Sequence, residues 1–236
     1  MKRFACAFVM LLVATLTGAL APLGPAGLGP RPAAAEGDEG AVAAAASPAQ
    51  GDEKGAVAAI DKLHATILDA MKQAKQLKYE GRYARLEPVI DETFDLPFMA
   101  EKSAGKYWND FTDEQKKRWT DTFSRMTKAN YAGRFDGYSN QRFETLGTEP
   151  AGFDTVLVRT RLLQPEKADE DVDINYRLHR MGSAWKIVDI YLSGTVSELA
   201  LRRAEYASVL QRDGFDKLLA QLESKITNLK SGAASD

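Results

Sequence analysis

Few side chains in this sequence could carry out catalysis. The chain has two histidines, His64 and His179, and one cysteine, Cys6, among its 236 residues. It contains no GxSxG, HExxH or glycine-rich phosphate-binding motif, so hydrolase, protease, redox and nucleotide-binding functions lack their usual residues. His64 lies beside the apolar stripe of an expected helix, with no second ligand at a useful spacing. We therefore expect no metal site and no cofactor.

Asp189 is the one candidate for acid–base chemistry. It stands in an aromatic and β-branched run, residues 185–192, that is typical of a strand. A carboxylate that shares a strand face with Trp185, Ile187 and Tyr191 must find a hydrogen-bond partner or protonate. Two interpretations stay open: a hydrogen bond that fixes the sheet, or a general base in a small α+β enzyme. His179 is expected on the opposite face, so it would not assist Asp189.

The strand that holds Asp189 is expected to be half of a hairpin. Apolar and polar residues alternate over residues 172–179, and Gly182 and Ser183 supply a turn before residues 185–192. This turn predicts three cross-strand pairs: Leu178 with Ile187, Tyr176 with Asp189, and Ile174 with Tyr191. Thr195 and Glu198 then have the spacing of a capping box, which predicts that a helix starts at Thr195.

The remaining elements are expected to cover the apolar face of this hairpin. Apolar periodicity predicts helices at residues 57–81, 83–94, 96–108, 112–131 and 215–229, and two further strands at 143–146 and 155–163. Asp95 is expected to cap the helix that has Pro97 in its first turn, and Thr112 and Gln115 have the spacing of a capping box. The connections between strands are short, which favours antiparallel pairing. We predict an α+β fold, in which a curved antiparallel sheet of three or four strands packs against helices that enclose an apolar cavity. A solidly filled core has the same periodicity, so that alternative stays open.

The amino terminus has the composition of a secretory signal. Met1, Lys2 and Arg3 provide positive charge, an apolar stretch follows to residue 20, and residues 33–35 are alanines suited to cleavage. We expect a signal peptide (1–35), a disordered spacer (36–55), one folded domain (56–230) and a disordered tail (231–236). An uncleaved inner-membrane anchor is the alternative. The net charge of -2 does not favour nucleic acid, and the product is expected to be exported and soluble.

Six short segments, in consistent order, resemble one known family. They are residues 96–98 (LPF), 104–107 (AGKY), 111–116 (FTDEQK), 185–190 (WKIVDI), 194–197 (GTVS) and 214–218 (GFDKL). The chain is similar to the periplasmic lipid-shuttle proteins of the Mla (maintenance of lipid asymmetry) pathway, also called the toluene-tolerance or ABC-transporter auxiliary family. A branch of this family is associated with hopanoid biosynthesis.

The resemblance implies that the domain 56–230 is a periplasmic lipid-binding carrier and not an enzyme. The acyl chains of a phospholipid would enter an internal cavity, and the head group would stay near the surface. The carrier would pass lipid between an inner-membrane ABC transporter with a lipid-binding ring subunit and an outer-membrane lipoprotein complex. A hopanoid is the rival cargo.

Such a carrier must replace nearly all the apolar contact that a bilayer provides. Each buried methylene contributes about 0.8 kcal/mol, so two chains of about sixteen carbons resist transfer through water by more than about 20 kcal/mol. Strand facing and helix stripes predict the residues that line the cavity: Phe98, Met99, Phe123, Met126, Tyr131, Val156, Val158, Tyr176, Leu178, Ile187, Tyr191, Val196 and Leu199. The cations suited to a phosphate head group are Lys102, Lys106, Arg134, Arg202 and Arg203.

Overall fold

The structure is a computed structural model that describes residues 53–232. The expected signal peptide (1–35), most of the expected spacer (36–52) and the end of the expected tail (233–236) lie outside the described residues. The first described helix begins at Glu53 and the last ends at Ser231. Over residues 53–232, no helix combines the length and the apolar character that a bilayer crossing requires.

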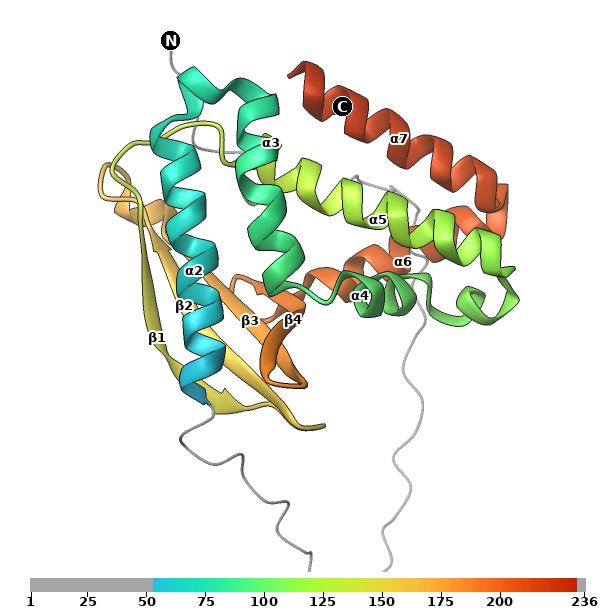
Figure 1. The fold of residues 1–236 in the computed structure, drawn as a ribbon, viewed down its shortest axis with the longest axis horizontal. Coiled ribbons are helices and arrows are strands. Elements are labelled where there is room, and N and C mark those ends of the chain that lie inside the picture. The colour runs from blue at the N-terminus through green and yellow to red at the C-terminus, as the bar shows by residue number, and fades with distance from the viewer. Residues whose placement is uncertain (1–52, 233–236) are drawn as a thin grey trace, which may run out of the picture. The chain divides into compact units, whose positions relative to one another are not determined.

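The strands form one antiparallel sheet in which each strand pairs with the next along the chain (Figure 1). This confirms the predicted α+β class and antiparallel sheet. The sheet has five strands because a two-residue strand follows the expected hairpin: β1 (Arg142–Pro150), β2 (Thr155–Leu163), β3 (Val172–Met181), β4 (Ala184–Leu192) and β5 (Val196–Ser197). A short 3-10 helix, η2 (Ala168–Glu170), stands between β2 and β3.

A β-bulge at Val188 changes the register within the hairpin. Leu178 pairs with Ile187 as predicted, but Val188 has no partner, and Tyr176 pairs with Ile190. Since a shift of one residue turns every later side chain to the other face, the predicted pairs of Asp189 and Tyr191 are wrong. Asp189 pairs with Arg177 and Tyr191 with Asn175, so both side chains lie on the face opposite Ile187.

The remaining elements are helical and follow the expected order. They are α2 (Glu53–Lys72), α3 (Ala74–Thr93), α4 (Leu96–Ala104), the 3-10 helix η1 (Gly105–Asp110), α5 (Asp113–Arg134), α6 (Glu198–Asp213) and α7 (Phe215–Ser231). Helix α2 packs on the apolar face of the sheet (Figure 1). There His64 stacks on Phe143 with ring centroids 3.8 Å apart, and its Nε2 lies 3.1 Å from the Tyr176 hydroxyl. Burial lowers the pKa of His64 to about 3, so His64 is a neutral core residue.

Helices α4 to α7 pack around Trp119. Its indole Nε1 donates to the carbonyl oxygen of Ala100 at 2.8 Å, and its ring meets that of Tyr206 edge-on at 5.2 Å. The predicted capping box of Thr112 and Gln115 is confirmed at the start of α5. Trp119 therefore joins α4, α5 and α6 into one unit beside the sheet.

The segment before α4 attaches these helices to the free edge of β4. Asp95 caps α4 by accepting from the Phe98 amide at 3.0 Å, and the Asp95 amide donates to the Ile187 carbonyl at 2.9 Å. Phe94 and Ile187 form an isolated parallel bridge. Helix α6, which also contacts β4, begins at Glu198, and the hydroxyl of its N-cap residue Ser197 accepts from the Ala200 amide at 2.9 Å. The predicted start at Thr195 is wrong, because residues 196–197 pair with β4 before the helix begins.

Candidate functional site

A small internal cavity lies where α4, α5 and α6 meet β4. Its volume is about 20 Å³, room for one water molecule. The lining residues come from both the sheet and the helices: Phe94, Met99, Phe123, Thr127, Asn130, Tyr131, Arg134, Ile190, Glu198, Leu199 and Arg202. One wall of the cavity is therefore apolar and the other carries charge.

In the charged wall, the ion pair of Glu198 and Arg202 is largely withdrawn from solvent, and Arg134 lies at its exposed edge. Glu198 is 8% exposed. Its Oε1 accepts from Arg202 Nη2 at 2.6 Å and lies 3.9 Å from Arg134 Nη1. Burial alone would raise the pKa of Glu198, but the charges of Arg202 and Arg134 hold that pKa below its usual value. Glu198 is thus a carboxylate, and Arg202 and Arg134 both face it.

Two tyrosines lie beside these charges: Tyr131 lines the cavity, and Tyr206 contacts Arg202 from outside the lining. Arg202 Nη1 donates to the Tyr206 hydroxyl at 3.3 Å. Burial raises the pKa of Tyr131 well above its usual value, so its phenol is neutral. The site therefore offers two guanidinium groups and the neutral phenol of Tyr131, which are donors suited to an anionic oxygen.

The structure divides the predicted lining residues into three groups. Four of the thirteen line the cavity: Met99, Phe123, Tyr131 and Leu199. Six are buried in the core without reaching it: Met126, Val156, Val158, Tyr176, Leu178 and Ile187. Three lie elsewhere. Phe98 is half-buried beside His179, Tyr191 is turned to the opposite face by the bulge, and Val196 is 43% exposed in β5.

The expectation of a spacious cavity differs from the packing in this structure. Residues of the sheet and of the helices close around this cavity, whose volume is only about 20 Å³. Close packing of this kind is the usual state of a protein interior. The larger hollow, about 500 Å³, is a surface groove outside α5 whose lining includes Trp108, Lys116 and Lys128, so it offers no enclosed apolar space.

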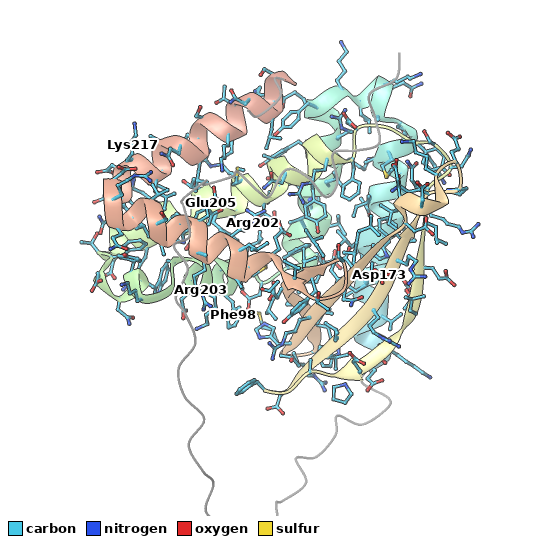
Figure 2. The ribbon with its side chains drawn as sticks, turned by 180° about the vertical axis from the view of Figure 1, so that it is seen from behind. Phe98, Asp173, Arg202, Arg203, Glu205 and Lys217 are labelled. Carbon is cyan, nitrogen blue, oxygen red and sulfur yellow. The ribbon has the colours of Figure 1, made fainter. Side chains whose placement is uncertain are left out.

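Two of the five predicted head-group cations belong to the cavity, Arg134 and Arg202. The other three lie outside it. Lys102 pairs with Glu101 at 2.6 Å, and Lys106 lies over the Tyr107 ring. Arg203 is exposed and packs against Gly105. Figure 2 shows Arg202 and Arg203 leaving α6 in different directions, as neighbouring residues on a helix must.

Asp189 has a structural role in this arrangement. Its Oδ1 accepts from the amides of Ile190 at 2.8 Å and Leu199 at 3.1 Å, and its Oδ2 accepts from the Ser197 hydroxyl at 2.7 Å. Burial raises its pKa, while these three hydrogen bonds oppose the rise. Asp189 thus ties β4 to the start of α6, which matches the structural one of its two interpretations.

Sequence reasoning missed five lining residues: Phe94, Thr127, Asn130, Ile190 and Glu198. One signal was available for Glu198, since Arg202 follows it at the i+4 spacing of a helical ion pair. Ile190 was hidden by the bulge. Within residues 53–232, no three side chains of His, Cys, Asp or Glu gather as potential metal ligands.

The chain resembles one protein family and one solved phospholipid-binding protein. No curated protein sequence matches the chain. Among solved structures, the fold is similar to that of a phospholipid-binding protein from Ralstonia solanacearum in complex with a phospholipid, with a TM-score of 0.62 and 22% identity. The match covers 75% of this chain and 98% of the Ralstonia chain. The family model described as MlaC protein matches residues 61–224. The chain therefore belongs to the MlaC family.

Proposed function

We propose that this protein is a periplasmic carrier that binds the acyl chains of a phospholipid between its sheet and its helices. The observation that carries the proposal is the two-sided wall of the cavity, which is apolar at Phe94, Met99 and Phe123 and cationic at Arg134 and Arg202. A phospholipid has the same division between hydrocarbon and phosphate. Membership of the MlaC family and the phospholipid in the similar Ralstonia protein support it.

Acyl chains need far more room than about 20 Å³, since pockets for molecules of drug size already measure roughly 300–1,000 Å³. Carriage therefore requires α4, α5 and α6 to move away from β4. We call the boundary between these helices and β4 the seam. It has a polar tie at each end: the Asp95 amide donates to the Ile187 carbonyl, and the Asp189 side chain accepts from the Leu199 amide of α6. Apolar contacts lie between these ties, and hydrocarbon can replace them at little cost.

In this proposal the phosphate lies beside Arg134 and Arg202. Arginine suits phosphate because its planar fork donates two parallel hydrogen bonds. The carrier would receive lipid from, or deliver it to, an inner-membrane ABC transporter with a ring subunit and an outer-membrane lipoprotein complex. The amino terminus would act as the export signal that brings it to the periplasm.

Native mass spectrometry and lipid extraction of the purified protein test the proposal. We expect one glycerophospholipid per chain, acquired either in the cell or from labelled phospholipid vesicles. A co-purifying triterpenoid would make hopanoid the cargo instead. Protein that takes up neither lipid from the cell nor label from vesicles would overturn the carrier function.

A further inference from the structure

Two neighbouring turns at one end of the sheet carry exposed apolar side chains. Thr155 of β2 pairs with His179 of β3, so the β1–β2 turn and the β3–β4 turn lie side by side (Figure 1). Phe153 in the first turn is 95% exposed, and Met181 at the second is 50% exposed. We call these two residues the hairpin tip.

The backbone at Phe153 is strained. Phe153 and Asp154 have φ of 50° and 53°, and the Thr155 amide donates to the Gly152 carbonyl at 3.1 Å. This is a tight turn with both central residues in the left-handed region, where Asn-Gly is the favoured pair. A bulky aromatic residue is uncommon there, so Phe153 occupies this turn against its own backbone preference.

Arg177 fixes this strained turn from β3. Its Nε donates to the Thr155 hydroxyl at 2.8 Å, and its Nη2 donates to the carbonyls of Ala151 at 3.0 Å and Gly152 at 3.3 Å. Because three acceptors of one turn share a single guanidinium, the turn is held in a defined conformation. Phe153 thus projects into solvent from a turn whose conformation Arg177 fixes.

The size and charge of the hairpin tip indicate which partner suits it. Two apolar side chains offer roughly 300 Å², far less than the ~800 Å² that each partner buries in a standard protein interface. Within four chain positions of Phe153 and Met181, the charged residues are two carboxylates and two guanidinium groups, which balance: Glu149, Asp154, Arg177 and Arg180. A bilayer surface accepts single aromatic side chains at head-group depth and needs neither shape complementarity nor opposite charge.

We propose that the hairpin tip inserts Phe153 and Met181 into the surface of a zwitterionic bilayer. Observed backbone strain at an exposed residue supports a function for that residue. The tip lies near α4, since the ring of His179, two residues before Met181, lies 5.3 Å from the ring of Phe98 on that helix. Insertion would hold the α4 side of the seam against the membrane. This bilayer contact goes beyond carriage, since a carrier could exchange its cargo through protein partners alone.

Flotation of the purified protein with phosphatidylcholine vesicles tests the insertion. We expect the wild type to bind, and Phe153→Asn to lower the partition coefficient about tenfold or more, because most of the inserted apolar area is lost. Met181→Asn should lower it several-fold. Leu146→Asn is the matched control: Leu146 is 39% exposed but lies at a bulge in the middle of β1, so its replacement should leave binding unchanged.

Thermal stability and salt dependence distinguish insertion from misfolding of the variant and from electrostatic adsorption. Asn suits the left-handed turn, so Phe153→Asn should keep or raise Tm while it loses vesicle binding. Partition should change little between 50 and 300 mM salt, since the tip has no net charge. Three results would each overturn the proposal: no binding by the wild type, equal binding by Phe153→Asn, or binding only to vesicles with phosphatidylglycerol at low salt. Carriage itself is measured separately by lipid extraction, so either idea can fail alone.

Discussion

Replacing Glu198 by Gln removes the carboxylate that both cavity arginines face. Arg202 would keep the Tyr206 hydroxyl, but its guanidinium, with 14% of the side chain exposed, would lose its counter-charge. Breaking a buried ion pair from one side costs about 3–5 kcal/mol. Gln keeps one hydrogen-bond acceptor, so we expect a loss of about 3 kcal/mol in the free energy of unfolding, or about 6–12 °C in Tm.

The control for this variant is Glu223→Gln. Glu223 also pairs with an arginine, Arg125, at 2.8 Å, but the side chains are 45% and 38% exposed. Exposed pairs contribute roughly 0–1 kcal/mol, so this variant should unfold almost as the wild type does. Urea denaturation of the three proteins gives the comparison directly.

The decisive measurement is the effect of added lipid on the Tm of Glu198→Gln and of the wild type. If Arg134 and Arg202 hold a phosphate, a phospholipid returns the negative charge that Glu198→Gln lacks. Binding to the native state alone raises stability, and tighter binding raises it more, so phosphatidylglycerol should raise Tm more in Glu198→Gln than in the wild type, and diacylglycerol should not. The reasoning is refuted if Glu198→Gln unfolds within about 1 kcal/mol of the wild type, or if phosphatidylglycerol raises its Tm less.

Three further substitutions test the core, the seam and the cavity. The pKa of His64 is about 3 in the folded state against 6.5 for an exposed histidine, so below pH 6.5 His64 binds protons mainly in the unfolded state, and about 2 kcal/mol of stability is lost by pH 5. His64→Gln should remove this dependence of stability on pH, as urea titrations at several pH values can show. An unchanged dependence would contradict the assignment of His64 as a neutral core residue. Asp189→Asn weakens the acceptors for the Ser197 hydroxyl and the Leu199 amide, so the free energy of unfolding should fall by about 1–3 kcal/mol, whereas unchanged stability would contradict this role of Asp189. Phe123→Ala should cost about 3–5 kcal/mol without lipid and less with bound phospholipid, as differential scanning calorimetry can show; an equal cost in both conditions would place Phe123 away from the cargo.

Sequence patterns predicted the elements that local chemistry controls. The capping box at Thr112, the Asp95 cap before Pro97 and the α+β order all agree with the structure, because each depends on residues only a few positions apart. The site was predicted in part: Met99 and Arg134 reach the cavity. A helical stripe shows which side of a helix is buried, but many buried residues pack on each other and few border the cavity.

Two errors, in the register of the hairpin and in the start of α6, arise from one unpaired residue and one short strand. Strict alternation over residues 185–192 makes no allowance for the bulge at Val188, which moves Asp189 and Tyr191 to the other face. The pairing of Val196 and Ser197 with β4 delays the start of α6 and leaves Val196 exposed. Both depend on pairing geometry and not on residue type, so periodicity alone does not reveal them.

The way the sheet ends on its two sides bears on self-association. Phe94 bridges to Ile187 at one end of the outer side of β4, and β5 pairs at the other end. On the opposite side, β1 is broken by a bulge before Gly147 and ends at Pro150. Covered, bulged or proline-ended margins are poor templates for a strand from another molecule. We therefore expect that helices α4 to α6 can move away from β4, as proposed for lipid binding, without exposing a strand edge that starts aggregation.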